Sequence, residues 1–316
     1  WDVTMSGGYT YENWQIKAWL ARKKPIDIFP DISPVVCPLS ALKRPLTNFD
    51  DKRNNYTITR AMVVSDPHFG FNKNTITQEL TPYHDERALQ IALDIFADNE
   101  FDYLIWGGDL LDCNEWSTHF IRRPEFRQTT QPAINIAAKW LASFVNAKPY
   151  AKYIALKGNH DDRIETYIIN NLDEVYNIIP GDDPDSEPLM SISNLLGLKR
   201  LGIDYRESFM IGTTKFIHGD IAKKGGGATA RAHLENTISN IVFAHVHRRE
   251  LITETKTGYG DERVEVFSMC PGCVCYTDGR VPGSSEDSNW QNGIGVLEFL
   301  GNGCISHQII LTVSYI

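Results

Sequence analysis

The sequence of 316 residues has no apolar run close to the ~18 residues that a membrane-spanning helix needs. It does not open with the basic, apolar and small-residue pattern of a secretory signal peptide either. We therefore expect no membrane partner. With no secretion signal, the six cysteines are expected to be reduced thiols of a cytoplasmic protein.

Two further features are lacking, namely a zinc-ribbon spacing and an excess of positive charge. The cysteine cluster CPGCVC at 270–275 has no second Cys/His pair at that spacing, so we expect half-buried strand cysteines there. The formal net charge is −9. A protein this acidic is not expected to coat nucleic acid non-specifically, which normally requires a basic surface, although local basic patches remain open.

The sequence divides into two parts that differ in composition. Residues 29–45 carry four prolines, too many for a regular helix or a central strand. We interpret 1–55 as a proline-rich N-terminal arm or linker and 56–316 as the main domain. At 42% apolar and 22% charged residues, the chain has an ordinary globular composition and can bury a substantial core.

The main domain begins with a regular alternation of strands and helices. Strands are expected over 56–66, 103–109 and 152–160, with helices over 84–99, 131–147 and near 163–179. The second half is richer in strands, and it ends in a hairpin over 293–313 that turns at 301–303. Alternation followed by hairpins predicts an α/β sandwich.

Five short polar motifs lie at or near the ends of expected strands. They are DPH with Asp66 and His68, GDLLD with Asp109 and Asp112, GNHDD at 158–162, HGD with His218, and AHVH with His245 and His247. Open α/β sheets place their ligand crevice at the carboxyl ends of the strands, so we expect these motifs to converge. Five motifs that each close an apolar strand are unlike the isolated surface histidine or satisfied core histidine that a single match would indicate.

The residue types in these motifs predict a metal centre. Four histidines, two aspartates and an asparagine offer nitrogen and oxygen ligands without a thiolate, which suits Mn, Fe, Zn, Ni or Co. Seven ligands are too many for one catalytic ion with an open position, but they suit two ions that share a carboxylate. The glycines before Asp109 and Asn159 are expected to let the backbone turn sharply.

The order of these motifs over about 56–250 resembles that of the calcineurin-like metallophosphoesterase superfamily, D-x-H, GD-x-x-D, GNH-D/E, H and GH-x-H. The tail segments PGCVCYTDG and NWQNGIGVLEF resemble a phage and prophage branch labelled nuclease-like. The resemblance implies a four-layer α/β/β/α sandwich with a dinuclear metal site at the strand ends. It also implies a virus-encoded enzyme that acts in the host cytoplasm.

The resemblance further implies a role for each motif residue. Two divalent transition-metal ions, with Mn the first expectation, would be held by Asp66, His68, Asp109, Asn159, His218, His245 and His247. Asp109 would bridge the two ions. His160 would face the scissile phosphate as a catalytic residue, and Asp161 would orient it.

Two departures from the family pattern bear on these expectations. Ala244 replaces the glycine of GH-x-H, which we expect to be tolerated because alanine costs little unless the position needs a positive φ. Asp112 is followed by Cys113 and Asn114 instead of the V-D-R-G continuation of Ser/Thr phosphatases, which disfavours a protein phosphatase.

Basic residues follow the motifs and are candidate contacts for substrate phosphates: Arg122, Arg123, Arg163, Lys223 and Arg248. Aromatic rings near the motifs could stack on a base: Tyr83, His84, Trp116 and His119. The leading hypothesis is a metal-dependent phosphodiesterase whose partner is a nucleic-acid or nucleotide-like phosphodiester. A phosphomonoesterase or nucleotide phosphatase on the same metal core is the alternative. A non-catalytic scaffold is less favoured because it predicts lost ligands, and every ligand position is filled.

Overall fold

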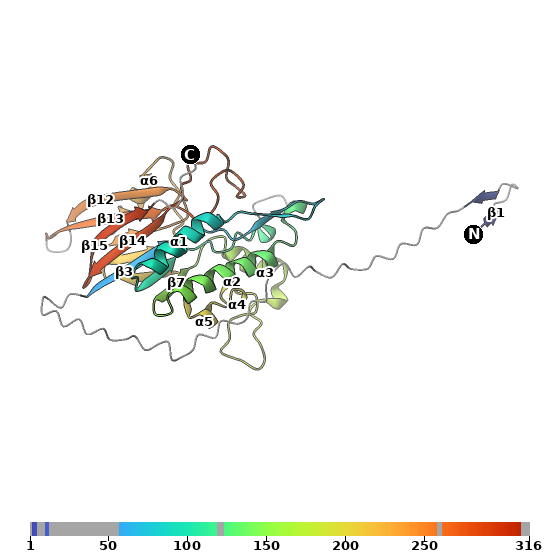
Figure 1. The fold of residues 1–316 in the computed structure, drawn as a ribbon, viewed down its shortest axis with the longest axis horizontal. Coiled ribbons are helices and arrows are strands. Elements are labelled where there is room, and N and C mark those ends of the chain that lie inside the picture. The colour runs from blue at the N-terminus through green and yellow to red at the C-terminus, as the bar shows by residue number, and fades with distance from the viewer. Residues whose placement is uncertain (1, 5–9, 13–56, 119–122, 258–260, 311–316) are drawn as a thin grey trace. The chain divides into compact units, whose positions relative to one another are not determined.

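The computed structural model of the chain describes residues 2–4, 10–12, 57–118, 123–257 and 261–310 (Figure 1). The chain divides into a first unit, Trp1–Pro34, and a second unit, Val35–Ile316. In the first unit the short strands β1 (Asp2–Thr4) and β2 (Thr10–Glu12) pair antiparallel. Most of the predicted N-terminal arm, residues 5–9 and 13–55, lies outside the described residues.

The second unit is built around two sheets. The six-stranded sheet has the order β15-β14-β3-β6-β7-β8, formed by β3 (Ile58–Val64), β6 (Tyr103–Trp106), β7 (Lys152–Leu156), β8 (Ile203–Arg206), β14 (Ile294–Leu300) and β15 (Gly303–Ile310). Strands β3, β6, β7 and β8 run parallel, whereas β14 pairs antiparallel with both β3 and β15. The carboxyl ends of β3, β6 and β7 therefore share one edge of the sheet.

The five-stranded sheet has the order β12-β13-β11-β10-β9. Its strands are β9 (Ser208–Ile211), β10 (Thr214–Ile217), β11 (Asn240–Val242), β12 (Arg249–Thr257) and β13 (Arg263–Pro271). Strands β10 and β11 are parallel neighbours, so their carboxyl ends also share an edge. A separate hairpin pairs β4 (Phe71–Lys73) with β5 (Leu80–Pro82).

Helices cover the outer face of each sheet. The helices are α1 (Glu86–Asp98), α2 (Thr130–Ala147), α3 (Asp162–Asn171), α4 (Ile192–Leu195), α5 (Leu198–Leu201) and α6 (Ala228–Leu234), with 3-10 turns η2 (Asn114–Trp116), η3 (Pro124–Phe126) and η4 (Asp173–Val175). Figure 1 shows α1 and α2 side by side along the six-stranded sheet. Helix α6 packs on β12 and β13 of the other sheet.

Burial along β3 explains why the second half of this strand, residues 61–64, is entirely apolar. Ala61 and Val63 pack between the two sheets, with Phe216 of β10 and Met269 of β13 in the same cluster. Alternate residues of β3, such as Met62, face the helix-covered side. A strand buried on both faces needs no polar alternation. The layers are thus helix, sheet, sheet and helix, which confirms the predicted four-layer α/β/β/α sandwich.

The predicted elements differ from the observed ones mainly at their ends and in the second half. The strand expected over 152–160 ends at Leu156, and the helical region near 163–179 forms α3 and the turn η4. Strand β12 was not predicted, although the residues of RELITETKT alternate in exposure. No helix among the described residues is both long enough and apolar enough to cross a membrane.

Candidate metal centre

The five sequence motifs meet where the strand ends of both sheets come together. Asp66 and His68 follow β3, Asp109 follows β6, and Asn159 follows β7. From the other sheet, His218 follows β10, and His245 and His247 follow β11. Three groups of Asp and His side chains place their ligand atoms within 4.8 Å of one another, and two of them consist of predicted ligands: Asp66, His68, Asp109 and His247, and Asp109, His218 and His245. The third group is His68, Asp112 and His160. Asp109 belongs to both of the first two groups.

The first group is fully buried and compact. His68 Nε2 lies 3.0 Å from His247 Nε2, and Asp66 Oδ1 lies 3.3 Å from the same nitrogen. Asp109 Oδ2 is 3.8 Å from His68 Nε2. Two imidazole nitrogens and two carboxylate oxygens that converge in this way match the donor set of a borderline divalent ion.

The second group shares Asp109 with the first. His218 Nε2 is 3.4 Å from Asp109 Oδ2. Asn159 Oδ1 lies 3.0 Å from His218 Nε2 and 2.8 Å from His245 Nδ1. The structure therefore brings all seven sequence-predicted ligand residues together, and this cluster has the donor atoms of a dinuclear divalent-metal site.

Hydrogen bonds around the cluster fix the orientation of its members. His68 Nδ1–H donates to Asp112 Oδ1 at 3.1 Å, and His218 Nδ1–H donates to the backbone oxygen of Gly107 at 2.8 Å. Both bonds leave Nε2 free to face the ligand group, which is how outer contacts select the tautomer of a metal-binding histidine. Asp109 Oδ1 accepts the backbone N–H of His160 at 2.8 Å.

The backbone at the cluster has an uncommon conformation. Five of the ligand residues have φ in the left-handed region: Asp66 (49°), His68 (46°), Asp109 (49°), His245 (71°) and His247 (55°). His245 and His247 therefore reach the site from left-handed turns beyond the end of β11, and not through strand alternation. Ala244 is absent from the positive-φ residues, which explains why alanine is accepted there.

The two glycines before the ligands act differently. Gly108 has φ of 99°, as expected for a sharp turn before Asp109. The backbone does turn at 159–161, as expected, but Gly158 has no positive φ. A Cβ at Gly158 would instead collide with the backbone nitrogen and Oδ1 of Asp109. Gly158 is required for close approach of the β7 and β6 loops.

The structure corrects the role expected for Asp161. Its carboxylate accepts the backbone N–H groups of Gly158, Leu110 and Leu111 at 3.0, 3.4 and 3.1 Å. The acid beside His160 is Asp112, whose Oδ1 lies 3.2 Å from His160 Nδ1. Asp161 therefore ties the metal-site loops together, and Asp112 contacts both His68 and His160. The sequence motif contained Asp112 but did not reveal this double contact.

The charges of the cluster shift the pKa values of its members. Burial, together with the nearby His160, lowers the pKa of His68 to about 4. Burial also opposes the charged form of His218, but Asp109 outweighs it and raises the pKa of His218 to about 10. For His160, Asp109 and Asp112 outweigh burial and raise the pKa. Burial, with the charge of Asp109, raises the pKa of Asp161 to about 7.

Of the predicted substrate-contacting basic residues that the structure describes, Arg163 is the one placed at the cluster. Its Nη1 donates to the backbone oxygen of Asp112 at 2.7 Å, and its Nη2 donates to His160 Nε2 at 2.9 Å. Arg248 is instead engaged within the protein, because its guanidinium binds Glu250, Thr229 and the backbone oxygen of Lys223.

The remaining predicted basic and aromatic contacts lie apart from the metal ligands or are buried. The side chain of Lys223 lines a separate surface hollow that contains no predicted ligand. Arg123 lies in a neighbouring cleft. Arg122 and His119 fall outside the described residues. Tyr83 and His84 are at most 1% exposed, so neither can stack on a substrate base.

One aromatic contact at the cluster was missed by sequence reasoning. The ring of Trp290 lies edge-to-face against His247, with ring centroids 4.0 Å apart. Trp290 belongs to the tail segment NWQNG, more than 40 residues after His247, and no spacing rule links the two. Only the fold brings this indole to the metal centre.

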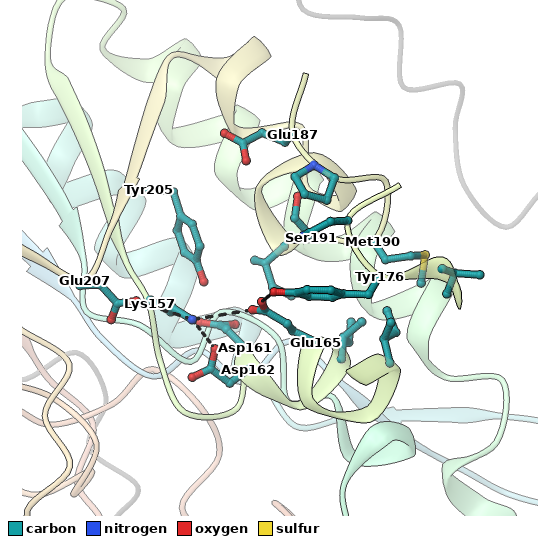
Figure 2. Close-up of a pocket in the computed structure, with 16 residues that line it drawn as sticks. Lys157, Asp161, Asp162, Glu165, Tyr176, Glu187, Met190, Ser191, Tyr205 and Glu207 are labelled. Atoms are coloured by element: carbon teal, nitrogen blue, oxygen red, sulfur yellow. Dashed lines mark hydrogen bonds and ion pairs between the residues drawn. The ribbon is translucent and has the colours of Figure 1, made fainter. Parts of the chain in front are cut away.

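A cavity of about 300 Å³ lies behind the loop that carries Asn159 and His160. Figure 2 shows Lys157 in this cavity, pointing toward Asp162, Glu165 and Glu207, with nitrogen–oxygen distances of 2.6, 3.8 and 3.6 Å. Asp161 lines it, but none of the seven predicted metal ligands does. The cavity is therefore distinct from the metal centre.

Comparison with solved structures finds distant similarities. Solved structures with similar folds include Yfce, a phosphoesterase from E. coli (13% identity, 79% of this chain and 98% of that chain, TM-score 0.34). A second is a purple acid phosphatase from yellow lupin (Lupinus luteus) seeds (9% identity, 81% of this chain and 52% of that chain, TM-score 0.37). A third is the NAD nucleotidase of Haemophilus influenzae (12% identity, 81% of this chain and 50% of that chain, TM-score 0.32). Because these TM-scores are low, none of them supports a functional conclusion.

The family of the chain is shown by its sequence. No curated protein matches it significantly. A family model described as calcineurin-like phosphoesterase, however, matches residues 59–249, which is more than half of the chain and includes all seven predicted ligands. The chain therefore belongs to the calcineurin-like phosphoesterase family.

Proposed function

We propose that the protein is a dinuclear-metal-dependent phosphodiesterase that hydrolyses nucleic-acid or nucleotide-like phosphodiesters. Asp66, His68, Asp109 and His247 would hold one ion, and Asp109, Asn159, His218 and His245 the other. When bound by these residues, two divalent ions, which we expect to be Mn²⁺, would supply charge stabilisation for the phosphate and an activated water. The observation that carries the proposal is the convergence of these seven side chains around the shared Asp109.

His160 is proposed as the residue that protonates the leaving oxygen. Its Nδ1 lies beside Asp112, which holds the ring and raises its pKa, so the protonated form is favoured. Its Nε2 currently accepts an N–H from Arg163. A substrate phosphate would be a stronger acceptor for that guanidinium. Movement of Arg163 to the phosphate would leave Nε2 free to carry the proton.

A diester is favoured over a monoester by the surroundings of Asp112. The position after Asp112 is a buried cysteine, Cys113, and not a cation that could clamp a terminal dianion. Among the predicted basic residues with described side chains, Arg163 alone contacts the metal-site motifs. One guanidinium matches the single negative charge of a diester. The similarity of the tail to the nuclease-like branch supports the same substrate class.

A phosphomonoesterase or nucleotide phosphatase is the second candidate. Arg163 is the observation that favours it, because a guanidinium held at the backbone of Asp112 could form a bidentate contact with a terminal phosphate. The filled ligand positions disfavour the scaffold hypothesis, since an inactive relative is expected to have lost metal ligands.

The test is hydrolysis by the Mn²⁺-loaded protein of bis-p-nitrophenyl phosphate, p-nitrophenyl phosphate, single- and double-stranded DNA, RNA and cyclic nucleotides. We expect faster turnover of the bis ester than of the monoester, and loss of all activity in excess chelator. Asp109→Asn serves as the inactive reference. Faster turnover of the monoester without cleavage of any diester would establish the second candidate, and activity that survives chelation would exclude both.

A further inference from the structure

A cleft beside the metal centre has the composition of a nucleotide-binding site. It has a volume of about 650 Å³ and is lined by residues of the β4–β5 hairpin, η2, η3 and α3. Two aromatic rings, Trp116 and Tyr167, and three cations, Lys73, Arg123 and Arg127, lie along it. None of these residues belongs to the five metal-site motifs.

The chain connects this cleft directly to the metal centre. Asn114 lines the cleft and follows Asp112 by two residues, so their Cα atoms are at most ~7 Å apart. On helix α3, Tyr167 follows Arg163 by four residues, which puts both side chains on one face about 6 Å apart along the axis. Arg163 in turn contacts His160. A ligand in the cleft can therefore extend to the catalytic residues.

The ring of Trp116 is held in place before any ligand binds. Its Nε1–H donates to Thr130 Oγ1 at 2.9 Å, at the start of α2. Tyr167 meets it edge-to-face, with ring centroids 5.3 Å apart and an interplanar angle of 83°. A fixed indole that lines an open cleft is a platform on which a nucleobase can stack with little loss of side-chain entropy.

The side chains that line the cleft carry more positive than negative charge. Its one acidic lining residue, Glu115, accepts the backbone N–H of Gln128 at 2.8 Å and the hydroxyl of Thr130 at 2.7 Å. Its negative charge is thus directed at the start of α2. Arg123 and Arg127 are exposed, and neither forms an ion pair with a carboxylate in the described part of the chain.

A second hollow of about 610 Å³ adjoins the cleft and shares Arg123 and Phe126 with it. The second hollow extends to the loop at 279–284. Arg123 therefore lies where the two hollows meet. Two adjoining hollows with a cation at their boundary suit an extended chain of phosphates better than a single small molecule.

We propose that this cleft binds an unpaired nucleotide of a single-stranded nucleic-acid substrate, an inference that rests on the proposed phosphodiesterase function. The base stacks on Trp116, and the phosphates next to it contact Arg123 and Arg127. A base inside a duplex cannot reach this wall because it is stacked between its neighbours. The cleft thus selects single strands, and the metal centre supplies the hydrolysis.

The experiment measures how strongly an oligodeoxythymidylate of twelve residues inhibits bis-p-nitrophenyl phosphate hydrolysis by the metal-loaded enzyme. This inhibition constant reports binding whether or not the strand is cleaved. We expect Trp116→Ala to raise it about tenfold, the effect of one lost stacking contact. The same variant should leave inhibition by an abasic strand of equal length within twofold of wild type, because that strand has no base to stack.

The charged contacts are tested with the double variant Arg123→Ala/Arg127→Ala, whose side chains are exposed and whose fold should therefore be intact. Two lost phosphate contacts should reduce the slope of the logarithm of affinity against the logarithm of salt concentration by about 1.4. The matched control is Lys199→Ala/Arg200→Ala, which removes two exposed cations on α5. An oligouridylate tests whether single-stranded RNA binds as DNA does, and a DNA duplex tests whether paired strands bind. Only the duplex is expected to bind weakly.

The results separate this inference from the proposed function. If the wild-type enzyme does not hydrolyse the bis ester, the proposed function fails. If it does, but the duplex binds as tightly as the single strand, or Trp116→Ala weakens the abasic and thymidylate strands equally, the cleft is not a base-binding site. An unchanged salt slope in the double-arginine variant would likewise overturn the inference.

Discussion

Replacement of Asp112 by Asn should impair metal binding and proton transfer together. The carboxylate of Asp112 lies 3.1 Å from His68 Nδ1 and 3.2 Å from His160 Nδ1. It is completely buried, so water does not screen these contacts. Both histidines lie at Oδ1, and an asparagine oxygen in that place could still accept from both. Asparagine brings no negative charge, however, and its second terminal atom becomes a donor.

The first consequence concerns the ion held by His68. Outer carboxylates that hydrogen-bond a metal-binding histidine typically contribute ~10–100-fold to metal affinity. We expect Asp112→Asn to weaken one of the two ions by a factor in this range, while the ion at His218 and His245 is retained. Metal content after dialysis against buffers of graded free Mn²⁺ measures this difference.

The second consequence concerns the pH profile. Asp112 raises the pKa of His160 through a hydrogen bond and through its charge, whereas burial and Arg163 lower it. A group that acts as an acid works in its protonated form, so activity falls as pH rises through its pKa. Loss of Asp112 lowers that pKa, and the falling limb of kcat against pH should move to lower pH. The substrate should be a diester with a poor leaving group, because p-nitrophenol needs no proton.

The control is Asp162→Asn, which removes a neighbouring carboxylate that pairs with Lys157 on the far side of the loop. This control should keep wild-type metal content and an unshifted profile. If Asp112→Asn binds both ions with wild-type affinity and keeps the wild-type pH profile, the double contact has no functional role and the assignment of Asp112 is refuted.

Further predictions follow from the same geometry. Asp109→Asn should weaken both ions at once, as metal analysis would show; loss of one ion alone would contradict a bridging role. The pKa of His218 is about 10 before metal binds, so its Nε2 must lose a proton when an ion binds there. The apparent affinity for Mn²⁺ should therefore rise by up to about tenfold per pH unit over roughly pH 6–8. Isothermal titration calorimetry would measure this rise, and an affinity that does not change with pH would contradict it. His160→Ala should keep both ions while kcat falls ~10²–10⁴-fold, with a smaller defect on p-nitrophenyl esters; a lost ion would identify His160 as a ligand. Gly158→Ala should reduce metal content through its collision with Asp109, and wild-type content would show that the loop relaxes.

The positions of the metal ligands could be predicted from the sequence because they depend on a simple rule. Each motif follows an apolar strand, and parallel strands bring their carboxyl ends to one edge. The contacts of Asp161 and Asp112 could not be predicted in this way. Adjacent residues in a tight loop point in different directions, and only the backbone course shows that Asp161 turns to three amides while Asp112 reaches two histidines.

The second half of the chain was harder to interpret for a related reason. Strand β12 has few apolar residues, because one of its faces is exposed along most of its length. Charged residues were equally ambiguous: Arg248 follows a metal-site motif directly, yet its guanidinium binds the buried Glu250. Sequence proximity to a site does not determine whether a cation faces substrate or the interior of the protein.

The left-handed backbone at five ligand positions links the choice of residue to the geometry of the site. A positive φ is uncommon for residues other than glycine, but Asn, Asp and His adopt it several times more often than most. All five positions hold Asp or His, the residues that can also ligate a borderline ion. Strained conformations of this kind persist only where the surroundings impose them. Here Asp66 accepts the backbone N–H of His245, so ligands from two sheets hold each other in place. The same side chains thus satisfy the backbone and the metal, and a substitution that preserved only the ligand atom would still disturb the site.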